Sequence, residues 1–176
     1  LAHGLLADHT MWDALAVRLA SRFSVLRYDL RGHGCSGMAP GPCTMERLAA
    51  DAVALLDALE LSRVHSIGSS LGGMIGQQLG AHHAHRLLSL TLANTAAVQP
   101  APQAWEDRIA LARSRGVAAL ADGTLQRWFT PGFAQANPAQ LQRMRDILCR
   151  TPVEGFAACA QAVRDLAQLH LLPAIR

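Results

Sequence analysis

The sequence contains no lysine, and all 16 of its cationic residues are arginine. A lysine amine is needed for Schiff-base chemistry and for a Ser-Lys catalytic pair, so both mechanisms are excluded for this sequence. The arginines are scattered singly along the chain, and the formal net charge is only +3. Because nucleic-acid-binding domains gather their basic residues in a patch or stripe, we expect no nucleic-acid partner.

Long apolar runs and paired cysteines are also missing. No apolar run reaches the roughly 18 residues that a membrane-spanning helix needs, so we expect no association with a membrane. Cys35, Cys43, Cys149 and Cys159 show no C-x-x-C spacing, which predicts free thiols in a cytoplasmic protein rather than a disulfide framework. Leu1 is not an initiator methionine, and we therefore expect the chain to begin inside an open reading frame.

Charged residues make up only 16% of the chain and hydrophobic residues 51%. Such a composition predicts one globular domain with a core rather than a disordered chain. The apolar patterns predict helices at 11–22, 44–60 and 71–84 and strands at 23–29, 63–68 and 87–94. Thr10 and Thr44 are the expected N-caps of the first two helices. Strands and helices that alternate over short connections predict an α/β fold with a parallel sheet.

After Asn94 the pattern changes to helices alone. The expected helices are at 102–115, 116–129, 138–149 and 152–167. A helical block that follows a strand of a parallel sheet is either a lid over the carboxyl ends of the strands or a separate domain. We expect a core at 1–96, a helical lid at 97–170, and a return toward the core at 171–176.

The stretch "HSIGSSLGGMIG" (65–76) contains the pattern G-x-S-x-G between a predicted strand and a predicted helix. In that context a sharp turn presents the central serine, Ser70, above the edge of the sheet and at the amino end of a helix. Gly68 and Gly72 then remove side chains that would collide with the turn. Gly72, Gly76 and Gly80 follow at every fourth residue, which predicts a helix face that approaches the sheet closely.

Seven segments together resemble the α/β-hydrolases, and among them the 3-oxoadipate enol-lactonases. They are "HGLLADHTMWD", "VLRYDLRGHGCSG", "IGSSLGGMIGQQLG", "LTLANTAA", "AWEDRI", "RWFTP" and "EGFAACAQAVRD". The first three are shared broadly among α/β-hydrolases and imply the fold and the nucleophile. The later ones are more specific to the lactonases. The resemblance implies an α/β-hydrolase fold with Ser70 as nucleophile and an oxyanion hole formed by the backbone N–H groups of Leu5 and Leu71.

A serine nucleophile needs a base, and in this fold the acid and then the histidine follow the serine in the chain. Four histidines are too far from Ser70 along their strand or helix: His65, His82, His83 and His85. His3 and His33 precede the serine and match family motifs with other roles, and His170 has no defined position at the end of the lid. None of them is the expected base.

Asn94 occupies the position after the next strand, where some α/β-hydrolases carry the acid, and an amide cannot replace a carboxylate. We therefore expect both the acid and the histidine of the triad to lie beyond residue 176. On this interpretation the sequence is an internal fragment that would be nearly inactive alone.

An enol-lactone with a free carboxylate requires an apolar pocket with a cation at one end. Trp105 with Arg108, and Arg127 with Trp128, are the candidate residues for lining it. The alternative is an amphipathic lid helix whose tryptophan is core and whose arginine is solvated. The run "HHAHR" (82–86) fits a solvated helix end better than a metal site, and we expect neither a metal nor a cofactor.

The expected function is hydrolysis of a small carboxylic ester or lactone through an acyl-enzyme on Ser70, with 3-oxoadipate enol-lactone in the degradation of aromatic compounds as the favoured substrate. Two alternatives remain open. One is other chemistry on the same scaffold, such as general esterase, perhydrolase or C–C hydrolase activity, and the other is a non-catalytic ligand-binding or truncated product. The sequence does not define the oligomeric state.

Overall fold

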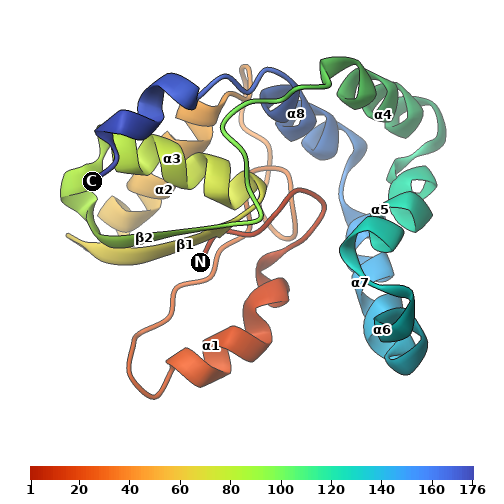
Figure 1. Ribbon diagram of the computed structural model, residues 1–176, viewed down its shortest axis with the longest axis horizontal. Coiled ribbons are helices and arrows are strands. Elements are labelled where there is room, and N and C mark those ends of the chain that lie inside the picture. The colour runs from red at the N-terminus through yellow and green to blue at the C-terminus, as the bar shows by residue number, and fades with distance from the viewer.

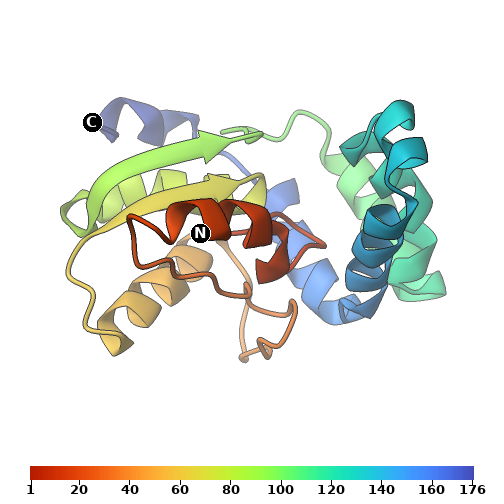
Figure 2. The ribbon, with the colours of Figure 1, turned by 90° about the horizontal axis from the view of Figure 1, so that it is seen from below.

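The computed structural model describes residues 1–176, and at its centre lie two parallel strands, β1 (Val64–Ser69) and β2 (Leu87–Ala93). Two helices, α2 (Met45–Ala58) and α3 (Leu71–His82), cover one face of this sheet. The short helix α1 (Asp13–Leu19) lies on the opposite side (Figure 1; Figure 2). The α/β class and the parallel pairing expected from the sequence are therefore confirmed.

The two strands end at the same edge of the sheet. Ser69, the last residue of β1, is paired with Ala93, the last residue of β2. Because the strands are parallel, the residues that follow each strand meet at this edge. Ser70 and Thr95 are thereby brought together although 25 positions separate them.

The prediction of a strand at 23–29 is wrong. The segment is extended, but its only ladder contact is an isolated parallel bridge between Tyr28 and Ala2, and Ala2 also bridges Gly68. In addition, the terminal ammonium of Leu1 donates to the carbonyl of Leu26 at 2.8 Å. A strand is defined by hydrogen bonds to a neighbouring strand, and the chain at residues 1–2 provides too short a partner for a continuous ladder.

The first helix is shorter than expected. Residues 11–22 were expected to be helical, whereas the structure has a 3₁₀ turn at His9–Trp12 followed by α1. The N-cap is Asp8 rather than Thr10, and its carboxylate accepts the Thr10 amide at 2.9 Å. An aspartate that precedes the first helical residue competes successfully for the free amides of the first turn.

The two helices that cover the sheet, α2 and α3, begin and end close to the residues expected from the sequence. Thr44 caps α2, and its hydroxyl accepts the amide of Arg47. Helix α3 is almost completely buried, with Leu71 and Ile75 inaccessible to solvent. Side chains of α2, α3 and α8 belong to one hydrophobic cluster, and α3 packs against both strands and α2.

A block of helices follows β2. It consists of α4 (Pro102–Arg115), a 3₁₀ turn at Val117–Leu120, α5 (Ala121–Trp128), α6 (Pro131–Ala136), α7 (Pro138–Arg150) and α8 (Val153–Arg164). Helices α4 and α8 pack together, and α5 to α7 stand away from the sheet (Figure 1). None of the helices is long and apolar enough to cross a membrane.

Three details of this block differ from expectation. Gly116, with a φ of +79°, ends α4, and the helix expected at 116–129 is divided into the 3₁₀ turn at Val117–Leu120 and α5. Helix α6 was missed, since its sequence is rich in glycine and proline, yet Thr130 caps it by accepting the Phe133 amide. Residues 171–176, the expected approach to a strand, lie mostly in a 3₁₀ helix at Leu169–Ala174.

The two ends of the helical block are joined to each other and to α3. Val98 forms an antiparallel bridge with Ala167. The side chain of Gln168 is buried, where it donates to the carbonyl of Met74 at 3.0 Å and to the amide oxygen of Gln77 at 2.9 Å. The block thus leaves and rejoins the core at one place on helix α3.

Candidate active site

Ser70 has a backbone conformation that is rare for a residue with a side chain. Its φ is +52° and its ψ is −113°, in a region that costs free energy for all residues except glycine. The surrounding backbone holds it there: the Ser70 amide donates to Ala93, and the Ser70 carbonyl accepts from Met74 and from the hydroxyl of Thr95. Ser70 lies in the sharp strand-to-helix turn that G-x-S-x-G predicts.

The glycines around Ser70 have the close contacts expected of them. A Cβ at Gly68 would lie 2.1 Å from the carbonyl oxygen of Gly72, and a Cβ at Gly72 would lie 2.2 Å from that of Ala2. Further along α3, a Cβ at Gly76 would lie 2.9 Å from Leu92. The predicted close approach of this helix face to the sheet is confirmed.

The loop that contains Leu5 lies against Ser70. A Cβ at Gly4 would be 3.4 Å from the Cβ of Ser70 and 3.9 Å from its Oγ. The Gly72 amide donates to the carbonyl of His3 at 3.1 Å, which ties this loop to the first turn of α3.

Both amides of the expected oxyanion hole are free of backbone partners. The amide of Leu5 makes no hydrogen bond, although the residue is buried. Leu71 is the first residue of α3, where an amide has no acceptor within the helix. Buried amides without partners are rare in folded proteins, and a site for a negatively charged oxygen is one reason for a fold to retain them.

His3 supports the loop and is not a base. Its Nε2 accepts the amide of Leu30 and its Nδ1 donates to the carbonyl of Gly4, both at 2.8 Å. Burial lowers the pKa of His3 to about 4, so the ring is neutral at pH 7. His33 is also buried, its pKa is lowered by burial, and its Nδ1 donates to the carbonyl of Arg31.

No histidine or carboxylate of residues 1–176 makes a hydrogen bond with Ser70 Oγ. His9 lies in the 3₁₀ turn before α1, where its Nδ1 bonds to Asp29. The other histidines lie on β1, on α3 or just after it, and in the last 3₁₀ helix: His65, His82, His83, His85 and His170. No group of three or more His, Cys, Asp or Glu side chains is arranged to hold a metal ion. Ser70 is therefore positioned but has no base among these residues.

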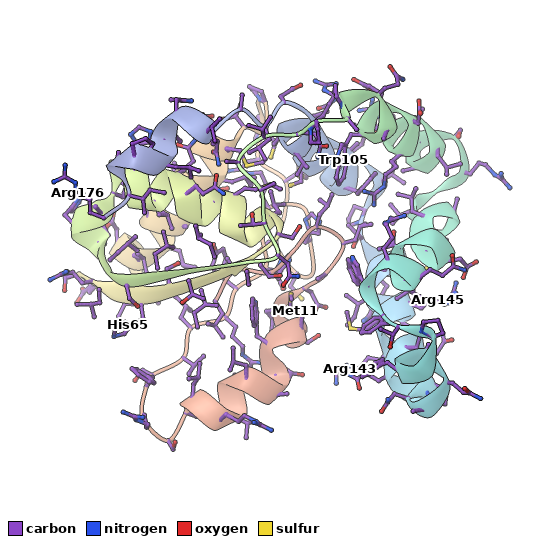
Figure 3. All side chains as sticks on the ribbon, viewed as in Figure 1. Met11, His65, Trp105, Arg143, Arg145 and Arg176 are labelled. Carbon is purple, nitrogen blue, oxygen red and sulfur yellow. The ribbon has the colours of Figure 1, made fainter.

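Two of the four candidate substrate residues, Trp105 and Arg108, are stacked on each other. The guanidinium of Arg108 stacks 4.4 Å above the ring of Trp105 and 5.8 Å from that of Phe156. Trp105 belongs to α4, which packs against α8 (Figure 3). Burial, followed by the charge of Arg127, lowers the pKa of Arg108 to about 10. Neither arginine has a carboxylate partner, and the buried Nε of Arg108 has no partner at all.

The fourth candidate, Trp128, is 40% exposed at the end of α5. A cavity of about 660 Å³ lies along the sheet and is lined by residues such as Leu26, Ile67 and Leu79. Ser70 and the four candidate substrate residues do not line it. The structure therefore stacks Arg108 on Trp105, and this cavity does not join the two residues to Ser70.

Sequence reasoning missed Thr95. Its hydroxyl donates to the Ser70 carbonyl at 2.8 Å. It also packs against Gly73, where an added Cβ would lie 2.7 Å from Thr95 Cβ. Sequence reasoning also missed Asp29, whose carboxylate accepts the amides of His9 and Cys35 and the Nδ1–H of His9. Both residues follow the carboxyl end of an extended apolar segment, and that position is the signal that would have identified them.

A strained serine between a strand and a glycine-rich helix, with two free amides beside it, defines a class of proteins. The chain belongs to the α/β-hydrolase fold family, whose sequence model matches residues 1–144. The match to this family confirms the fold that the sequence motifs imply.

Among curated proteins, the chain is 35% identical over 156 residues to 3-oxoadipate enol-lactonase 2 of Acinetobacter baylyi, a match that covers 89% of this chain and 58% of the relative. It is 34% identical over 146 residues to a protein of Caulobacter sp. (strain K31) named for carbamate hydrolysis, with 81% and 54% covered. The chain thus spans less than two thirds of the length of these relatives.

Among solved structures, the chain is similar to the enol-lactonase from Burkholderia xenovorans LB400, with a TM-score of 0.96 and 38% identity over 99% of this chain and 67% of that one. It is also similar to a hydrolase from Pseudomonas aeruginosa PA01, with a TM-score of 0.94 and 39% identity over 99% and 66%. The resemblance to enol-lactonases noted in the sequence motifs is therefore confirmed by both comparisons.

Proposed function

We propose that Ser70 is the nucleophile of a hydrolase that cleaves small carboxylic esters or lactones. The observation that carries the proposal is the backbone of Ser70, whose φ of +52° holds the side chain at the end of β1 and beside the first turn of α3. Folded proteins retain such strain mainly where function requires it. The hydroxyl attacks the acyl carbon, an acyl-enzyme forms, and water then releases the acid.

The negative oxygen that develops during attack is stabilised by the amides of Leu5 and Leu71. Both are fixed by the fold before substrate arrives, so they need no reorganisation during the reaction. The base and its orienting acid come from residues outside 1–176. Residues 1–176 alone are then nearly inactive, because loss of triad members leaves only binding and oxyanion stabilisation.

The substrate we favour is a lactone that carries a free carboxylate, as in 3-oxoadipate enol-lactone. Arg108 and Arg127 have no acidic partner in the fold, and a half-buried guanidinium without a counter-ion is well suited to bind a carboxylate. The stacked ring of Trp105 provides an apolar wall beside that cation. Helices α4 to α8 act in this proposal as a lid that carries these residues toward Ser70 when substrate binds.

Carbamate hydrolysis is a second candidate, favoured by the relatives that bear that name. Arg108 and Arg127 distinguish the two classes of substrate, because a carbamate ester has no carboxylate for a guanidinium to bind. The four unpaired cysteines support a cytoplasmic location for either enzyme.

The test compares the full-length gene product with its Ser70→Ala variant on three substrates: an enol-lactone with a carboxylate, an uncharged ester of similar size, and a carbamate. We expect Ser70→Ala to lower kcat by about 10⁴-fold or more with an unchanged circular dichroism spectrum. The proposal fails if the variant keeps its activity, and the substrate assignment fails if kcat/KM is highest for the carbamate.

A further inference from the structure

Two buried cysteines from distant parts of the chain lie side by side. The Sγ atoms of Cys43, which precedes α2, and Cys159, on α8, are 3.7 Å apart although 116 positions separate the residues. We propose that Cys43 and Cys159 form a reversible disulfide when the protein meets a hydroperoxide, and that this bond ties the loop before α2 to the helical block. This proposal rests on the contact between the two sulfurs and is independent of the function proposed for Ser70.

The backbone on both sides of the pair is already in contact. A Cβ at Gly155 would lie 2.1 Å from the carbonyl oxygen of Gly32, so α8 touches the loop with no side chain between them. Cys159 follows Gly155 by one helical turn and therefore faces the same loop. Its Sγ also lies 3.5 Å from the carbonyl oxygen of Arg31.

The remaining movement is small. A disulfide has an S–S distance of about 2.05 Å, so the two sulfurs must approach by roughly 1.7 Å. Rotation of the side chains about their Cα–Cβ bonds moves a sulfur by this amount. The backbone contact between Gly32 and Gly155 can then stay as it is.

Cys43 is the thiol expected to react first. It ends the Gly- and Pro-rich loop and is 9% exposed, whereas Cys159 is fully buried in α8. The hydrogen bond with Cys159, and then the positive charge of Arg31, lower the pKa of the Cys43 thiol, against the effects of burial and of Asp51. Arg31 is held in place by Asp51, which accepts its Nε–H at 2.8 Å. A thiolate, and not a thiol, is the form that attacks a peroxide.

The reaction uses one hydrogen peroxide and releases two waters. The Cys43 thiol first releases its proton. The thiolate sulfur attacks one peroxide oxygen, an S–O bond forms, the O–O bond breaks, and the departing hydroxide takes up the released proton as water. The Cys159 sulfur then attacks the Cys43 sulfenic acid, the S–S bond forms, the S–O bond breaks, and hydroxide leaves with the Cys159 proton as water. Two thiols are oxidised, the peroxide is reduced, and a dithiol reductant reverses the bond.

The experiment uses the full-length protein with Cys35 and Cys149, the two exposed cysteines, replaced by serine. Hydrogen peroxide is added to the folded protein, the remaining thiols are blocked, and the protein is digested with trypsin. Because the chain has no lysine, cleavage falls only at arginines and separates Cys43 in peptide 32–47 from Cys159 in peptide 151–164. We expect a loss of two hydrogen atoms from the intact mass and a linked pair of these two peptides that separates on reduction.

Oxidation should also raise the melting temperature by several degrees, because the bond closes a loop of more than a hundred residues in the unfolded chain. Adding Cys43→Ser or Cys159→Ala to the same background should abolish both the linked peptide and the shift. The proposal is overturned if both thiols remain free under peroxide, or if Cys43 is oxidised to a sulfinic acid without linking. It is equally overturned if the linked peptides form only in denaturant. This outcome is measured with both cysteines present, so it does not depend on whether a cysteine variant folds.

Discussion

The hydroxyl of Thr95 donates a hydrogen bond of 2.8 Å to the backbone carbonyl oxygen of Ser70. Thr95 follows the carboxyl end of β2 and Ser70 follows that of β1, so the bond crosses the edge of the sheet at the turn with the strained φ. Thr95 thus fixes the backbone of the candidate nucleophile from the neighbouring strand.

Replacing Thr95 with valine keeps the shape of the side chain and removes the donor. We expect a loss of about 1 kcal/mol in the free energy of unfolding, because the Ser70 carbonyl still accepts the Met74 amide. We expect kcat of the full-length protein to fall about tenfold through misplacement of the serine. Thr95→Ser keeps the donor and should retain most of kcat, and equal losses in both variants would refute the positioning role.

Gly72→Ala should destabilise the fold, since its Cβ would lie 2.2 Å from the carbonyl oxygen of Ala2. The cost expected from such a backbone contact is about 3 kcal/mol, measured by urea unfolding. Gly132→Ala is the matched control: it lies in α6 with no atom within 4 Å of the added Cβ. That variant should be neutral or gain up to about 1 kcal/mol from helix propensity.

Arg108→Met preserves the length of the side chain and removes its charge. We expect KM for a carboxylate-bearing lactone to rise at least about tenfold, which corresponds to about 1.4 kcal/mol of lost binding, while KM for an uncharged ester stays unchanged. Stability should be maintained, because the variant also removes a buried Nε that has no partner. Arg113→Met, at an exposed pair with Glu154, is the control, and an identical shift in both variants would contradict a role for Arg108 in binding.

Because His3 is buried, we expect it to make the free energy of unfolding decrease at acidic pH. Its pKa falls from the ordinary 6.5 to about 4 in the folded protein, so the unfolded chain binds the proton more readily. The stabilising contribution of neutral His3 is complete above pH 6.5 and is lost as the pH falls toward and through 4, by an amount on the order of 3 kcal/mol. His33, whose pKa is lowered by burial as well, adds to the same trend.

The measurement is urea unfolding between pH 7 and pH 4. His3→Gln keeps an oxygen that can accept the Leu30 amide and does not titrate, so its stability should depend less on pH than that of the parent. His170→Gln replaces an exposed histidine and should leave the slope unchanged. If His3→Gln has the slope of the parent protein, His3 is not the source of the acid sensitivity.

The sequence by itself determined the class of the fold and the place of the serine. Alternating apolar segments defined β1, β2, α2 and α3 to within a few residues, because period and capping are local properties. The G-x-S-x-G pattern located the turn, since only glycine tolerates the contacts found at Gly68 and Gly72. The free amide of Leu71 follows from its place at the start of α3, whereas that of Leu5 followed from the family motif.

The tertiary structure decided what depends on partners far along the chain. Residues 23–29 have strand composition but little backbone beside them to pair with, and pairing cannot be deduced from a single segment. The contacts of Thr95 with Ser70 and of Cys43 with Cys159 join elements that only packing brings together. The positions of Arg108 and Arg127 likewise arise from the way α4, α5 and α8 pack, because no local pattern fixes the distance between side chains on different helices.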